Sequence, residues 1–365
     1  MNECQTYKLG EICSRLKSGK GIPATEVFNI GNFPVIGGNG VRGYCEHSNF
    51  EGCCAVIGRQ GAYCGNVRFF EGKAYMTEHA IVVIGNDLAD TRYLAYLLST
   101  MQLGTLSAQS VQPGLSVNTL KKLPITIHQL AEQKRIAKIL GALDDKIELN
   151  RRINANLELQ AQTLFKYYFI DNTNLLGTSI IGNLTDIAHY QNGLAMQKFR
   201  PKDNELAIPV LKIKELGQGE CNESSDLCSS SINSDYIISD GDIIFSWSGT
   251  LLVDIWCGGK CGLNQHLFKV TSDTYPKWFI YYWTKYHLDK FIRIAKDKTV
   301  TMGHIRRCDL ETSTVLIPSE NVLTNIDALI SPILDSIIKN RVVNKKLSQL
   351  RDTLLPKLMA REINV

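Results

Sequence analysis

Cations and amides near glycines are the side chains of this sequence with the clearest chemical meaning. Lys and Arg bind phosphate groups, and Arg, Asn, Gln, Ser and Thr read the edges of nucleic-acid bases. Residues 285–307 hold seven Lys or Arg and two Asp, although a solvated helix face would show the same pattern. The candidate DNA-binding residues are Arg59, Gln60, Arg68, Lys73, Gln112, Asn118, Trp247, Ser248, Lys260, Lys296, Lys298, His304, Arg306 and Arg307.

Motifs for catalysis are weak or missing. The segment Gly38-Asn39-Gly40-Val41-Arg42-Gly43 fits the dinucleotide-binding glycine pattern, which works only where a helix begins. Residues 44–52 show no helical periodicity, so we predict a turn. The sequence contains no GxxxxGK[ST] loop, GxSxG elbow or HExxH motif. His79 and His266 occupy equivalent positions, and we interpret them as hydrogen-bonded structural residues.

The cysteines do not form a metal-binding pattern. Eleven occur in the sequence, singly or as the adjacent pair Cys53 and Cys54, without the repeated short spacings of a zinc site or a disulfide framework. We interpret them as reduced thiols. Cys257, Cys261 and His266 come nearest to a cluster but lack a fourth ligand. We therefore expect no metal, no cofactor and no enzymatic activity of the chain itself.

Composition limits the class of protein. A length of 365 residues with 44% hydrophobic and 21% charged residues indicates a folded protein with two domains. A net charge of +4 permits a nucleic-acid partner without demonstrating one. The first ten residues lack a signal-like apolar core, and no stretch approaches the ~18 uninterrupted apolar residues of a membrane span. We expect a cytoplasmic protein without a membrane partner.

An internal repeat organises the chain. Residues 129–169 have the apolar periodicity of a long helix, and residues 319–359 repeat it at a constant offset of 190. Their rhythm is that of a coiled-coil seam, so each helix needs a partner. The matched apolar pairs are Ile136 with Ile326, Leu140 with Ile330, Leu143 with Ile333, Ile147 with Ile337, Leu157 with Leu347 and Leu164 with Leu354.

Asparagines interrupt both apolar stripes. Asn150 and Asn154 lie in the first helix, and Asn340 and Asn344 occupy the equivalent positions of the second. A buried amide must find a hydrogen-bonding partner, so these residues are expected to set the register of the helix pair. The alternative is an exposed polar turn in the middle of each helix.

A globular segment precedes each helix. Residues 1–128 (the first globe) and 172–318 (the second globe) share short β-rich runs between glycines and one helical patch each. The interval from Gly-Lys to His is seven residues in both. We predict an α+β protein in which two mixed α/β domains alternate with helical spacers at 129–171 and 319–365. Antiparallel pairing of the helices is favoured, because parallel pairing would crowd the globes together.

This layout, with Leu130-Ala131-Glu132-Gln133-Lys134-Arg135-Ile136 opening the first helix, resembles the specificity subunit of type I restriction-modification systems. The resemblance covers essentially the whole chain. It implies that each globe is a target-recognition domain for one half of a split duplex DNA sequence. It also implies that the helices set the gap and dock two methyltransferase subunits, which restriction subunits join indirectly. The chain departs from the family at His128, where proline is usual, and at residues 319–325, where the Glu-Gln motif is missing.

Two other functions fit parts of the sequence. A self-sufficient DNA methyltransferase or nuclease would need a nucleotide-binding βαβ unit or an acidic metal cluster, and neither pattern occurs. A coiled-coil scaffold that binds only proteins would need the helices and the globes, but no DNA specificity. Selection from random duplexes distinguishes that scaffold from a specificity subunit.

Overall fold

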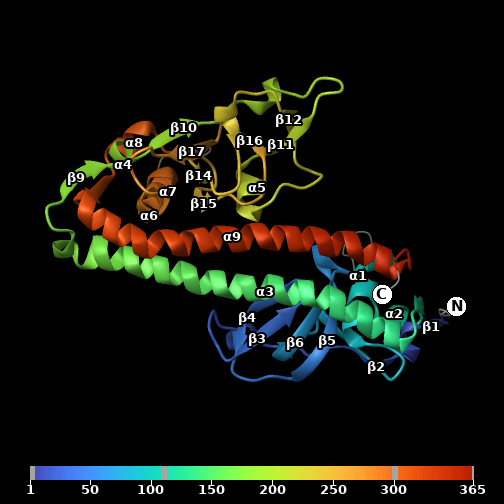
Figure 1. Cartoon of the computed structure of the whole chain (residues 1–365). Coiled ribbons are helices and arrows are strands. Elements are labelled where there is room, and N and C mark those ends of the chain that lie inside the picture. Colours follow the sequence, from blue (N-terminus) through green and yellow to red (C-terminus); the bar gives the residue numbers. More distant parts are fainter. Residues whose placement is uncertain (1–4, 108–113, 298–302, 364–365) are drawn as a thin grey trace. The chain divides into compact units, whose positions relative to one another are not determined.

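The computed structural model describes residues 5–107, 114–297 and 303–363, so Gln112 and Lys298 lie outside the described residues. The chain forms two compact units, Met1–Asp145 with Ser348–Val365, and Lys146–Leu347. Figure 1 follows the chain by colour, with helix α3 (Leu130–Lys166) in green and helix α9 (Glu320–Met359) in red. Each unit contains one globe and one part of both long helices.

The first unit is built on a six-stranded sheet with the order β2-β7-β5-β6-β3-β4. Strand β3 runs parallel to β6, and the other pairs are antiparallel. Helix α1 (Thr91–Ser99) follows the last strand of this sheet, and α2 (Val117–Lys121) precedes a two-stranded ribbon of β1 and β8. The strands are β1 (Gln5–Lys8), β2 (Cys13–Ser18), β3 (Phe33–Gly37), β4 (Gly40–Cys45), β5 (Phe50–Gly58), β6 (Val67–Met76), β7 (Ala80–Gly85) and β8 (Pro124–Ile127).

Alternation along β5 gives this sheet two buried faces. Ala55 and Ile57 belong to a core that also contains Tyr93 of α1, whereas Cys54 and Val56 belong to a separate core on the other face. Successive side chains of a strand point to opposite faces, so a run of apolar residues is required when both faces are covered. The predicted turn at residues 38–43 is confirmed, because these residues form the β3–β4 hairpin and no helix begins there.

The second unit has two four-stranded sheets, ordered β10-β17-β14-β15 and β12-β11-β16-β13, and a ribbon of β9 and β18. Its strands are β9 (Ile180–Asn183), β10 (His189–Asn192), β11 (Ala207–Leu211), β12 (Leu227–Ser229), β13 (Ile237–Ile238), β14 (Ile243–Ser246), β15 (Leu252–Ile255), β16 (Cys261–Leu263), β17 (Leu267–Thr271) and β18 (Thr314–Ile317). Its short helices are α4 (Leu184–Ile187), α5 (Ile213–Gln218), α6 (Lys277–Tyr286), α7 (Leu288–Asp297) and α8 (Arg307–Glu311).

The strand registers confirm the internal repeat and the α+β class. Val35 faces Tyr75 across the parallel pair β3–β6, and Val210 faces Gly262 across the parallel pair β11–β16. The antiparallel pairs β5–β7 and β14–β17 also correspond, since Gly58 faces Ala80 in one and Ser246 faces Leu267 in the other. Two copies of one strand arrangement therefore underlie the weak sequence likeness of the globes.

Both predicted long helices are present. Helix α3 has 37 residues and passes at Lys166 into a π-helical turn, Tyr167–Asp171, while α9 has 40 residues. Among the described residues, α9 is the one helix long and apolar enough to cross a membrane by length and composition. Part of its apolar side is buried, since Ile326, Ile330 and Leu334 belong to the core of the second unit.

The four asparagines form a symmetric ladder within the second unit. Asn150 Nδ2 donates to Asn344 Oδ1 over 2.8 Å, and Asn340 Nδ2 donates to Asn154 Oδ1 over 2.8 Å. Asn154 and Asn344 complete the ladder by donating to the carbonyl oxygens of Ile337 (3.1 Å) and Ile147 (3.2 Å). Residue numbers rise along α3 as they fall along α9, so the two segments run antiparallel here.

Candidate nucleic-acid interface

Strand β5 delivers two candidate residues to one end of the sheet in the first globe. Arg59 N donates to His79 O over 2.9 Å, and Arg59 O accepts from Leu115 N over 2.8 Å. Gln60 pairs with Gly114 in an isolated β-bridge and is exposed. The backbone hydrogen bonds on both sides hold this segment extended. The Gln60 side chain is exposed, and the half-buried Arg59 donates from Nη1 to Glu78 O over 3.5 Å.

Arg68 lies near the same end of the sheet. Its Nη2 donates to Asn39 Oδ1 over 3.1 Å, in the turn between β3 and β4. Gly40 in this turn has a φ of +100°, a conformation that favours glycine. Lys73 does not join the group, because it faces Glu51 near the other end of β5 and pairs with it over 3.2 Å. Asn118 is exposed on α2.

The same strand end in the second globe carries Trp247 and Ser248. Trp247 N donates to His266 O over 3.4 Å, and Trp247 O accepts from Ile305 N over 3.0 Å, which reproduces the hydrogen bonds of Arg59. Ser248 forms a β-bridge with His304, and the rings of Trp247 and His304 are 6.3 Å apart. The structure thus brings three of the candidate residues, Trp247, Ser248 and His304, together.

The remaining candidates of the second globe are spread over its surface. Lys260 is exposed just before β16, whereas Ser248 contacts the turn after that strand. Lys296 is exposed on α7. Arg306 and Arg307 lie at the start of α8, where each has a carboxylate within 4.0 Å, from Asp309 and Glu311 respectively.

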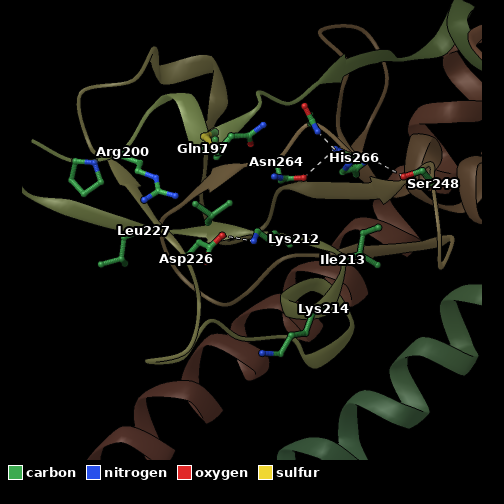
Figure 2. Close-up of a pocket in the computed structure, with 14 residues that line it drawn as sticks. Gln197, Arg200, Lys212, Ile213, Lys214, Asp226, Leu227, Ser248, Asn264 and His266 are labelled. Atoms are coloured by element: carbon green, nitrogen blue, oxygen red, sulfur yellow. Dashed lines mark hydrogen bonds and ion pairs between the residues drawn. The ribbon is translucent and has the colours of Figure 1, made fainter. Parts of the chain in front are cut away.

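A hollow of 880 Å³ opens beside Ser248 in the second globe. Figure 2 shows Arg200 and Leu227 on one side of it and His266 and Ser248 on the other. Its polar lining also includes Gln197, Lys212, Lys214, Asn264 and Gln265. Lys212 forms an ion pair with Asp226, and its hydrogen bond lowers the pKa of that carboxyl below the ordinary value. Apart from Ser248, these residues were not among the predicted candidates, because the lining comes from five separate segments of the chain.

A polar chain runs along one wall of the hollow. Gln265 Nε2 is 3.3 Å from His266 Nε2, and His266 Nδ1 is 3.0 Å from Ser248 Oγ. The turn that carries them is held by His266 N, which donates to Asn264 Oδ1 over 3.3 Å. Ser248 and Asn264 are buried, while Gln265 and His266 are half-buried. Among the described residues no group of three or more His, Cys, Asp or Glu could hold a metal ion, and the lining itself offers hydrogen-bond donors and acceptors.

Comparison with known proteins gives one consistent result. The family described as "Type I restriction modification DNA specificity domain" matches residues 1–159 and again residues 181–351. The type I restriction enzyme MjaIX specificity subunit of Methanocaldococcus jannaschii is 28% identical over 310 residues, which cover 78% of this chain and 71% of the relative. The EcoprrI specificity subunit of Escherichia coli is 36% identical over 140 residues, which cover 37% of this chain and 35% of the relative.

A solved structure shares the fold. The S subunit of a type I restriction-modification system from M. genitalium aligns with a TM-score of 0.64 at 16% identity. The alignment covers 98% of this chain and 96% of that one. At this identity the likeness concerns the fold alone.

Proposed function

Because this chain belongs to the family of type I restriction-modification DNA specificity domains, we propose that it reads a split duplex DNA sequence within such a complex. Specificity subunits are the non-catalytic members of these systems, and the methyltransferase and restriction subunits carry the chemistry. This chain is accordingly not an enzyme. We assign target recognition to residues 1–128 and 172–318, and the spacer role to residues 129–171 and 319–365.

The observation that carries the proposal is the pair of equivalent strand ends. Arg59 and Gln60 in one globe and Trp247 and Ser248 in the other have the same backbone hydrogen bonds, yet their side chains differ completely. A framework that is kept while its side chains change suits two surfaces that read different base sequences. Arg68, Lys73, Asn118, Lys260, Lys296, His304, Arg306 and Arg307 are proposed to add contacts, mainly to phosphates.

The helices serve as the spacer in this proposal. We assign α3 and α9 to an antiparallel coiled coil whose register is set by Asn150, Asn154, Asn340 and Asn344. If one helix slipped by one residue along the other, the buried amides would lose their hydrogen-bond partners, and each unsatisfied group costs about 1–3 kcal/mol. A spacer of defined register keeps the gap between the two half-sites constant. Two methyltransferase subunits would dock on this frame in the cytoplasm, and restriction subunits would join through them.

The test is a selection from random duplexes by the chain assembled with its methyltransferase partner. We expect enrichment of two short sequences separated by a gap of constant length. Recovery of no preferred sequence would contradict the proposal and favour a protein-binding scaffold. A parallel incubation of the isolated chain with S-adenosylmethionine and DNA should yield no methylated base. Methylation by the isolated chain would contradict its assignment as a non-catalytic subunit.

A further inference from the structure

Gln265 has a defined hydrogen-bonding direction in the wall of the hollow. A neutral imidazole carries one N–H, and an amide nitrogen can only donate. His266 Nε2 therefore accepts from Gln265 Nε2 (3.3 Å). His266 Nδ1 then carries the hydrogen and donates it to Ser248 Oγ (3.0 Å). This chain of bonds orients the Gln265 amide and anchors it through Ser248, which is 4% exposed.

The rest of that amide matches the edge of one base. Gln265 uses one N–H on His266, which leaves the second N–H and Oε1, and no other hydrogen-bond partner of this side chain occurs within residues 5–107, 114–297 and 303–363. In the major groove adenine presents an acceptor, N7, beside a donor, the N6 amino group, and glutamine binds both at once. Guanine presents two acceptors there and fits less well.

The hollow also offers cations for the backbone of a duplex. Arg200 and Lys214 line it and are exposed, whereas the charge of Lys212 is countered by Asp226. Arg200 lies across the hollow from His266 and Ser248 (Figure 2). An anionic strand passing over the rim would therefore meet positive charge on the side away from the polar chain.

We propose that Gln265 is a specificity-determining residue that reads an adenine in the half-site of the second globe. Arg200 and Lys214 hold the flanking phosphates. This inference rests on the proposed function, since it names the base that the surface reads. The equivalent position of the first globe holds Glu78, beside His79 as Gln265 is beside His266. A carboxylate only accepts hydrogen bonds, so the adenine pattern does not fit the first globe at this position.

The test compares sequences selected from random duplexes by the assembled complex carrying the wild-type chain or Gln265→Glu. The substitution keeps the size of the side chain and replaces the donor with an acceptor, which suits the amino group of cytosine. We expect adenine preference at one position of the second half-site to fall by on the order of 10- to 100-fold, with cytosine gaining. Gln265→Ala should lose adenine preference without gaining cytosine.

Matched controls locate the effect. Glu78→Gln, the reverse exchange at the equivalent position, should leave the second half-site unchanged. Arg200→Ala should weaken binding to all sequences alike and lower the salt slope by about 1. A wild-type complex that selects a split sequence, with the same second half-site selected by Gln265→Glu, would overturn this inference and leave the proposed function standing. A wild-type complex without any preference would overturn both.

Discussion

Asp144 and Arg351 in the first unit correspond, at the offset of 190, to Leu334 and Ala161 in the second. The first pair is ionic, with Arg351 Nη1 2.8 Å from Asp144 Oδ1, whereas Leu334 and Ala161 are 2% and 0% exposed and belong to an apolar core. The asparagine ladder between these positions is symmetric. At this position the contacts have diverged where the helices meet the side chains of different globes, with Tyr96 donating to Asp144 in one copy and an apolar core around Leu334 in the other. The ladder amides bond to one another across the two helices and are the same in both copies.

The starts of the two helices also differ, with a polar residue in the first copy and an apolar one in the second. Gln133, in the motif that opens α3, is fully buried and accepts from Asp90 N (2.9 Å) while donating to the carbonyl oxygens of Leu88 (3.0 Å) and His128 (2.7 Å). Its counterpart is Leu323, which packs against the apolar core of the second unit. Gln133 of the Glu-Gln motif thus joins the first globe to α3 by hydrogen bonds. At the start of α9 an apolar contact of Leu323 takes the place of these bonds.

The largest effect is expected from removing the Gln133 hydrogen bonds. Gln133→Ala should lower the free energy of unfolding of the first unit by about 3 kcal/mol, because one buried and two partly buried hydrogen bonds to the backbone are lost. Denaturant unfolding monitored on each unit would measure it. The exposed neighbour Gln129 is the control, and Gln129→Ala should change stability by less than about 0.5 kcal/mol. Equal effects of the two substitutions would refute the role given to Gln133.

Two arginines at equivalent positions of the long helices differ in burial and in ion pairing. Arg341 is 2.8 Å from Glu158 and 2.9 Å from Asp254, with about 30% of its side chain exposed, whereas Arg151 has 69% exposed and pairs with Glu148 at 3.9 Å. Arg341→Ala should cost about 2 kcal/mol, since it leaves two partly buried carboxylates without their shared cation. Arg151→Ala should cost about 0–0.5 kcal/mol. Thermal unfolding of both variants checks the contrast.

Substitutions in the asparagine ladder should change the stability less, and two of them together should cost less than the sum of the single changes. Asn150→Leu alone should destabilise the protein by about 1–2 kcal/mol, because Asn344 Oδ1 loses its donor. Asn150→Leu combined with Asn344→Leu should be clearly less destabilising than the sum of the single changes. A double-mutant cycle by denaturant titration measures this coupling, and strict additivity would argue against a register role.

The smallest effect concerns pH. Burial lowers the pKa of His128 and of His287 below the model-compound value of 6.5. The unfolded chain therefore binds protons more readily at these positions, so their contribution to stability is complete above pH 6.5 and is lost as the pH falls below it. Unfolding free energies of the wild type should decline from pH 7.5 to 5.5. His287→Gln should flatten part of that decline, and an unchanged slope would contradict the assignment.

Local patterns predicted much of the architecture. The repeat of Ile136, Leu140 and Ile147 at Ile326, Ile330 and Ile337 predicts both long helices, since helical periodicity is a property of consecutive residues. The turn at residues 38–43 was predictable because no helical pattern follows its glycines. The lining of the hollow was not, because Arg200 and Gln265 lie in separate loops and Lys214 lies in helix α5, and only the tertiary packing brings them together.

The sequence by itself determined the duplication, the two long helices and the asparagines at matched positions, because these features depend on spacing along one chain. The tertiary structure alone decided that Gln133 bonds to the backbone of the first globe, that Arg341 carries two ion pairs, and that Gln265 is oriented by His266 and Ser248. Hydrogen bonds between distant residues depend on which surfaces fold together, and that information is distributed over the whole chain.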